Sequence, residues 1–225
     1  MVKFFKFVIG CVLLPVTCLV IFEDLCILLG VIEHWQAALF FVVGAGVYTL
    51  IHYKFYQFPR MYVFIHEMTH ALAAVLCSIR IKDICVRQNS GYVKMTRTNT
   101  FVALAPYFRP GYVVILAMLC LLLGFFMDLT PYKPLVLFLV GFFMAFHFIQ
   151  TFHTLWEADQ PDLKLAGGKF FSTVTIVLAN MLVLALVLKI LFPQDVFLLE
   201  AAKQVALQMG KGIQIIVNYI MEKIK

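Results

Sequence analysis

Residues 61–76 read MYVFIHEMTHALAAVL, an apolar stretch with three ionisable side chains at its centre, His66, Glu67 and His70. Ionisable groups are rare inside a membrane span, because leaving water is costly unless partners satisfy them. The two histidines are four residues apart, so on a helix both imidazoles project from one face, one turn apart. This stretch therefore predicts a helix that presents two nitrogen ligands to one metal ion.

The composition of the whole chain supports a membrane setting for this helix. Hydrophobic residues make up 63% of the 225 residues, charged residues 13%, and the mean hydropathy is +0.96. A soluble fold of this size has too little interior for so much apolar surface, so lipid must act as part of the solvent. The formal net charge of +6 fits contact with anionic headgroups. The basic residues form no cluster with exposed aromatics, which argues against nucleic acid as a partner.

Apolar runs of roughly 20 residues, the length that crosses a bilayer, predict an all-α polytopic membrane protein with about six transmembrane helices. The expected spans are residues 5–31 (ending near Glu33 and His34), 36–51, 61–79, 101–127 (interrupted by Pro106 and Pro110), 135–156 and 170–192. Residues 90–96 alternate polar and apolar side chains around Gly91, which predicts a short β-hairpin after the motif helix. The tail has apolar residues at helical spacing with lysines among them, as in an amphipathic helix on a membrane surface. We therefore expect a transmembrane metalloprotease bundle over 1–193 and an amphipathic C-terminal helix over 194–225.

The sequence HExxH, here residues 66–70, is typical of zinc peptidases. Two imidazoles one turn apart can reach one Zn²⁺ ion, and Glu67 can orient and deprotonate a water at the metal. The alternative is that both histidines only hydrogen-bond to neighbouring helices while Glu67 pairs with a base. A metal ion satisfies all three groups at once and is the simpler interpretation.

A catalytic zinc normally has a third protein ligand. Two helices cross the membrane between the 80–100 loop and the 157–169 link, so these segments should share one side of the membrane. The candidate ligands on that side are Glu157, Asp159, Asp162, His147, Gln150 and His153. Pro161 breaks helical structure and could let the link fold inward around a metal, which favours Asp162. Glu157 and Asp159 fit a solvated helix end better than a metal site, and the two histidines fit packing within the bundle or hydrogen bonding to a ligand.

The sequence resembles the site-2 protease family of membrane-embedded zinc metallopeptidases over about residues 60–180. The resemblance rests on HEMTHALAA at 66–74, on Gly91-Tyr92-Val93 and on Ala103-Leu104-Ala105-Pro106. It implies that His66 and His70 bind zinc, that Glu67 is the general base and that Asp162 is the third ligand. It also implies that Gly91, Tyr92 and Val93 receive the substrate as an added strand. In this chain Leu163 follows Asp162, where the family usually has Gly.

These features predict an intramembrane zinc endopeptidase that cleaves transmembrane proteins within the lipid bilayer, in a multi-pass protein of a bacterial cell membrane. One alternative is a membrane metal-binding or transport protein that performs no hydrolysis. Another is a membrane zinc protease of the prenyl-protein type, in which Glu157 would be the third ligand.

Overall fold

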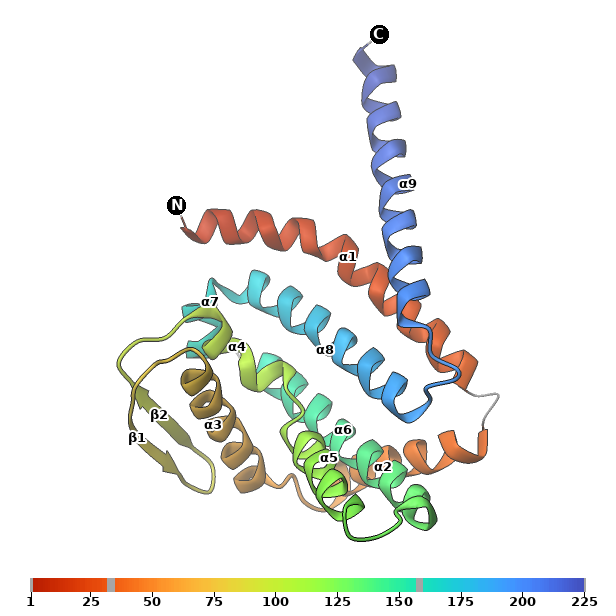
Figure 1. Cartoon of the computed structure of the whole chain (residues 1–225). Helices are drawn as coiled ribbons and strands as arrows, with labels where there is room; N and C mark the ends of the chain where they lie inside the picture. The colour runs from red at the N-terminus through yellow and green to blue at the C-terminus, as the bar shows by residue number, and fades with distance from the viewer. Residues whose placement is uncertain (1, 32–34, 157–159, 225) are drawn as a thin grey trace.

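The computed structural model describes residues 2–31, 35–156 and 160–224, and most of them lie in helices (Figure 1). The elements are α1 (Val2–Val31), α2 (Trp35–Lys54), α3 (Pro59–Leu76), β1 (Ile81–Val86), β2 (Gly91–Met95), α4 (Thr100–Phe108), α5 (Gly111–Gly124), the 3-10 turn η2 (Thr130–Tyr132), α6 (Lys133–Trp156), α7 (Pro161–Ala166), α8 (Lys169–Leu191) and α9 (Leu198–Ile224). The predicted helical fold with a hairpin after the motif helix is confirmed. Glu33 and His34, the expected end of the first span, lie outside the described residues.

The expected six membrane spans are not confirmed among the described residues. Three helices are long and apolar enough to cross a membrane: α1, α6 with its preceding 3-10 turn, and α8. The number reaches five if the bent pairs α2–α3 and α4–α5 each form one span, so six spans are not confirmed. The motif helix α3 qualifies only within its pair, because His66, Glu67 and His70 lower its hydropathy. The chain is nevertheless an integral membrane protein by its apolar helices.

A proline stands at both bends, at the start of α3 and just before α5. Helices α2 and α3 meet at 117°, and the residue before Pro59, Phe58, has the left-handed φ of 52°. The chain bends by 72° between α4 and α5, where Arg109 is extended before Pro110. The proline ring disfavours right-handed helical backbone in the preceding residue, which ends α4 before Arg109, whereas α2 already ends at Lys54. Pro59 then suits the first position of α3, where no N–H is needed.

The hairpin lies beside the motif helix α3 at one side of the bundle (Figure 1). Its strands are antiparallel, with Ile84 opposite Val93 and Val86 opposite Gly91. The connection between the strands contains Asn89 and Ser90, residues that favour turns. This pairing places the first residues of β2 next to α3.

Helix α4 lies at the centre of the fold and is buried from residue 102 to residue 107. It packs against α3, α7 and α8, so it joins the motif helix to the polar link. The hydroxyl of Thr100, at the start of α4, lies 3.4 Å from the carbonyl oxygen of Ala166 in the link. This contact places the end of the 80–100 loop beside Ala166 of the 157–169 link, as a shared side of the membrane requires.

Glycine allows α2 and α6 to pack closely. A Cβ on Gly44 would collide with the backbone of Phe138, and a Cβ on Gly141 would collide with the backbone of Phe41. Close approach at small residues is the usual way in which helices associate in lipid, where no hydrophobic force drives them together. The α2–α6 pair thus forms a rigid wall of the bundle.

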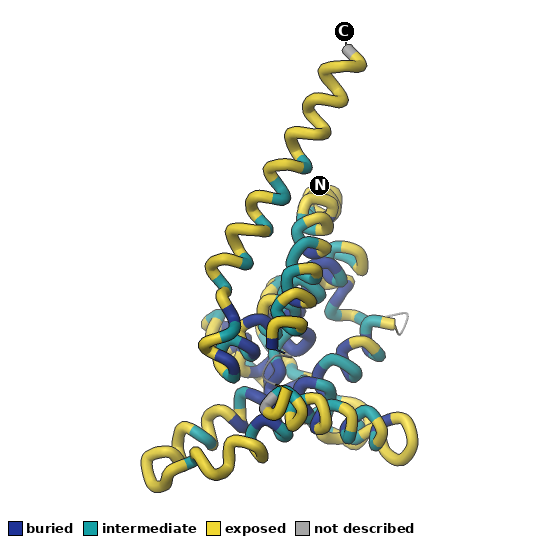
Figure 2. Tube along the Cα trace, turned by 90° about the vertical axis from the view of Figure 1, so that its right-hand side faces the viewer, coloured by how far each residue is buried: buried dark blue, intermediate teal, exposed yellow. Residues whose placement is uncertain are grey.

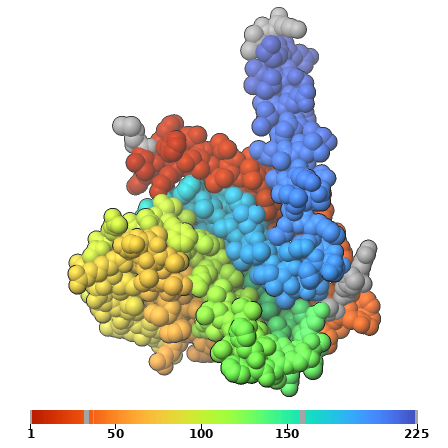
Figure 3. All heavy atoms as spheres, in the orientation of Figure 1, coloured from red at the N-terminus to blue at the C-terminus, as the bar shows by residue number. Residues whose placement is uncertain are grey.

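Helix α9 extends away from the bundle, and most of its surface is exposed (Figures 2 and 3). Its N-terminal half contacts α1, where the Gln208 amide donates to the Glu23 carboxylate at 3.3 Å. It has the most amphipathic pattern of the long helices, with Lys203, Lys211 and Lys223 among apolar residues. Its place on a membrane surface remains a prediction.

Candidate metal centre and catalytic site

His66 and His70 project side by side from α3. Their ring centroids are 4.8 Å apart and the rings are nearly perpendicular, at 81°. Both side chains are largely buried, with 12% and 9% of their surface exposed. The i, i+4 spacing thus produces the paired imidazoles that the sequence predicts.

The Asp162 carboxylate meets both imidazoles. Its Oδ2 atom lies 3.3 Å from Nε2 of His70 and 3.6 Å from Nε2 of His66. The three side chains can each offer a ligand atom, and these atoms lie within 4.8 Å of one another. They are the one group of three or more such residues found in the described part of the chain that could hold a metal ion. Asp162 reaches this point because Pro161 starts a short helix, α7, that folds over α4.

A backbone carbonyl sets the orientation of His70. Nδ1 of His70 lies 2.8 Å from the carbonyl oxygen of Val102, and a carbonyl can only accept, so Nδ1 carries the proton. Pro106 stands four residues after Val102 inside α4 and has no N–H, so it leaves that carbonyl without its helical donor. The proline thereby frees the oxygen that holds His70, and Nε2 of His70 turns its lone pair towards Asp162.

This arrangement fits a divalent cation. A lone pair of His70 faces a carboxylate oxygen at 3.3 Å, and two acceptors at this distance require positive charge between them, from a proton or a metal ion. Two imidazole nitrogens and one carboxylate oxygen form a donor set that suits Zn²⁺ with one position left open. Nδ1 of His66 is buried, and no described group bonds to it.

Asp162 is held in its charged form. Burial would raise the pKa of this carboxyl, but in the metal-free site the hydrogen bonds and positive charge that the two imidazoles supply when protonated outweigh burial and keep the pKa well below its usual range. The Tyr107 hydroxyl also donates to Oδ2 at 2.9 Å, which fixes the carboxylate from the side of α4. An anionic ligand of this kind strengthens a cation site.

Glu67 lies against the start of β2. A Cβ on Gly91 would come within 2.5 Å of Cγ and 2.9 Å of Oε1 of Glu67, so only glycine leaves room here. A cavity of about 440 Å³ opens between the hairpin and the three candidate ligands, and Gly91, Tyr92 and Val93 line it. The structure therefore brings the predicted substrate strand next to the predicted base.

A second cavity, of about 510 Å³, adjoins the site from the α2 and α6 side. Both cavities are lined by His66, Glu67 and Gln160, so they meet at the motif. The wall of the second cavity is largely polar and includes His52, Gln150 and His153. Together the cavities leave open space next to Glu67.

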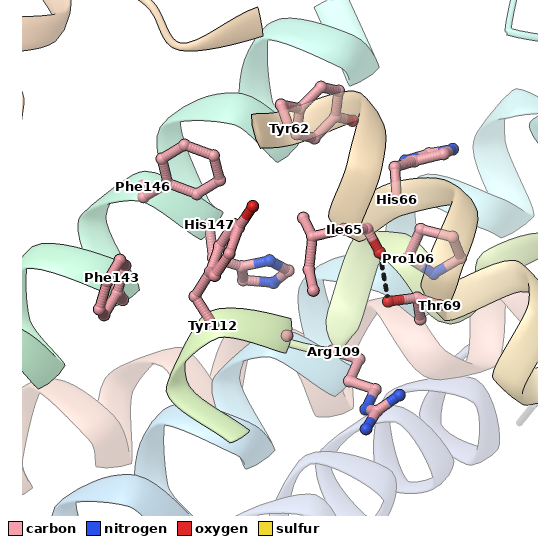
Figure 4. A pocket seen from close by; sticks show the side chains of 11 residues that line it. Tyr62, Ile65, His66, Thr69, Pro106, Arg109, Tyr112, Phe143, Phe146 and His147 are labelled. Atoms are coloured by element: carbon pink, nitrogen blue, oxygen red, sulfur yellow. Dashed lines mark hydrogen bonds between the residues drawn. The ribbon is translucent and has the colours of Figure 1, made fainter. Parts of the chain in front are cut away.

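The other described candidates for the third ligand stay away from the metal group. His147 donates from Nε2 to the Asn180 side-chain oxygen at 2.9 Å, and Figure 4 shows its ring near Tyr112, with the His66 ring turned the other way. The small cavity drawn there holds about 10 Å³, room for one water at most. Gln150 donates to the carbonyl of Gln57, and the ring of His153 packs 5.2 Å from that of His52. Glu157 and Asp159 lie outside the described residues.

Two features of this site were not predicted. The role of Tyr107 could have been inferred from the sequence, because a tyrosine hydroxyl in a buried apolar run needs a hydrogen-bond partner. The role of Pro106 at Val102 could not have been inferred, because it depends on how α3 packs against α4.

Comparison with known proteins identifies the family. The sequence model of the family described as Peptidase M50B-like matches residues 37–157, which contain the paired histidines, Glu67 and the hairpin. No curated protein and no solved structure matches the chain. The match covers more than half of the chain, which therefore belongs to the Peptidase M50B-like family, a site-2 protease family.

Proposed function

We propose that this protein is an intramembrane zinc endopeptidase that hydrolyses peptide bonds of transmembrane protein substrates. Its family suggests an intramembrane metalloprotease, and its apolar helices place it in a bilayer. The single observation that carries the proposal is the convergence of His66, His70 and Asp162 beside Glu67 at an open cavity. In this proposal the first three residues hold the metal.

A bound Zn²⁺ would lower the pKa of water and polarise the carbonyl that is attacked. The chain supplies the proton transfers. Glu67 is largely buried beside the cavity, where it takes a proton from the attacking water and later passes it to the leaving amine. During this transfer Val102 holds the neutral imidazole of His70 and Tyr107 holds the charged Asp162.

The hairpin supplies the place for the substrate. Gly91, Tyr92 and Val93 of β2 line the cavity, so an extended peptide that pairs with β2 would lie across Glu67. A helical substrate hides its carbonyls in its own hydrogen bonds and must unwind before attack. We therefore expect single-span substrates with helix-breaking residues near the scissile bond.

The test is the Glu67→Gln variant, which keeps the shape of the side chain and removes the base. It should bind zinc like the wild type and lose cleavage of a reconstituted single-span substrate by at least a hundredfold, the scale of one general base. A variant that cleaves as fast as the wild type would contradict this mechanism. A metal-dependent function that is indifferent to Glu67→Gln would instead support a carrier without hydrolysis.

A further inference from the structure

Lys6 of the first helix reaches the segment that carries Asp162. Its ammonium nitrogen lies 2.6 Å from the carbonyl oxygen of Ala166 and 2.7 Å from the hydroxyl oxygen of Thr100. These contacts join α1 to the start of α4 and to the end of α7. Lys6 and Asp162 both lie outside residues 37–157, the part of the chain that matches the family.

The contact with Ala166 caps the C-terminal end of α7. The last carbonyls of a helix have no donor within the helix, and a lysine can satisfy one of them and interact favourably with the helix dipole. Gly167 follows with a φ of 137°, and a Cβ on it would collide with the Lys6 side chain. The stem of Lys6 thus occupies the space beside the turn that ends α7.

Helix α7 depends on such support, because a helix from Pro161 to Ala166 is too short to be stable alone. Leu163 and Ala166 pack into the apolar core with α4 and α8, and Asp162 stands in the first turn. Tyr107 contacts the carboxylate, and Lys6 fixes the opposite end of the same helix.

We propose that Lys6 is a positioning residue that holds α7, and through it Asp162, at the metal centre. The inference rests on the proposed role of Asp162 as a ligand. It makes the first membrane helix part of the catalytic apparatus. The competing role for Lys6 is a headgroup anchor at the end of a membrane span.

The experiment uses the full chain in detergent or lipid and compares Lys6→Met with Lys3→Met. Lys3 lies on the same helix and is exposed, so its variant controls for charge and for membrane anchoring. Zinc affinity and hydrogen exchange of the amides of residues 163–168 in metal-free protein are measured for both. Lys6→Arg, which keeps a cationic donor, tests rescue. Lys6→Gln, which keeps a neutral donor, serves if Lys6→Met does not fold.

Lys6→Met should bind zinc roughly 10- to 100-fold more weakly, the usual effect of losing a partner that orients a ligand. Its amides at 163–168 should exchange at least about tenfold faster, since the helix end loses its charged donor and keeps only the longer contact with Thr100. Lys3→Met should match the wild type, Lys6→Arg should recover most of the affinity, and Lys6→Gln should lie between. Lys6 variants that match Lys3→Met in both measurements would overturn the inference alone. A wild type that binds no zinc would overturn the proposed function as well.

Discussion

Nδ1 of His70 lies 2.8 Å from the carbonyl oxygen of Val102, so the backbone of α4 determines which ring nitrogen faces Asp162. That oxygen is available because Pro106 cannot donate to it. A helix defect in α4 therefore sets the tautomer and orientation of an imidazole in α3. Such outer partners usually change metal affinity 10- to 100-fold.

Replacing Pro106 with Ala tests this relationship. The new N–H would compete for the Val102 carbonyl, so His70 would lose its fixed orientation and zinc affinity should fall roughly tenfold. The measurement is a zinc titration with a competing chelator. Pro15→Ala is the control, since Pro15 also lies inside a helix but in α1. Equal affinity in the two variants would refute the role given to Pro106.

Removing Asp162 tests the third ligand. Asp162→Ala should weaken zinc binding by more than about a hundredfold. That is more than the 10- to 100-fold effect of losing a residue that only orients a ligand. Glu157→Ala should retain zinc, and the comparison separates this proposal from a site of the prenyl-protein type. If zinc is lost in Glu157→Ala and kept in Asp162→Ala, the assignment of the third ligand is wrong.

Gly91→Ala tests the contact between the hairpin and the base. Its Cβ would come within 2.5 Å of Glu67 Cγ, so Glu67 or β2 must shift. Displacing a catalytic group by about 1 Å can cost about a hundredfold in rate. We expect kcat to fall by that order while zinc content stays unchanged. Gly210→Ala, which meets nothing within 4 Å, is the control, and equal rates in the two variants would exclude a close approach at Gly91.

Acidification should release zinc through the histidines. Ligand imidazoles must be neutral, and their ordinary pKa is about 6.5, so lowering the pH protonates them and weakens binding. The pKa of Asp162 lies well below its usual range, so this carboxylate stays charged throughout that transition. Zinc occupancy measured from about pH 7 to pH 4 should therefore fall with the uptake of about two protons. Release below about pH 4 with one proton would assign it to Asp162 instead.

The sequence was sufficient for the local parts of this site. The spacing of His66, Glu67 and His70 decides their common face once a helix forms, and Gly91 with its alternating neighbours decides the hairpin. The helical class likewise follows from apolar runs of roughly 20 residues. These features depend on residues close together in the chain.

The remaining parts depend on contacts between distant segments. The sequence favours Asp162 as the third ligand but does not exclude the acidic residues Glu157 and Asp159. The position of Asp162 depends on how α7 packs against α4 and on the contact with Tyr107. The predicted number of spans is not confirmed for a related reason. Proline bends join neighbouring segments into pairs, and apolar length alone does not show whether a bent pair crosses the membrane once or twice.

The most direct measurement is the zinc content of full-length protein purified without chelators, beside the double variant His66→Ala/His70→Ala. The proposal predicts one zinc ion per chain in the wild type and none in the variant. A wild type without bound zinc, or a variant that keeps it, would contradict a metal centre on α3.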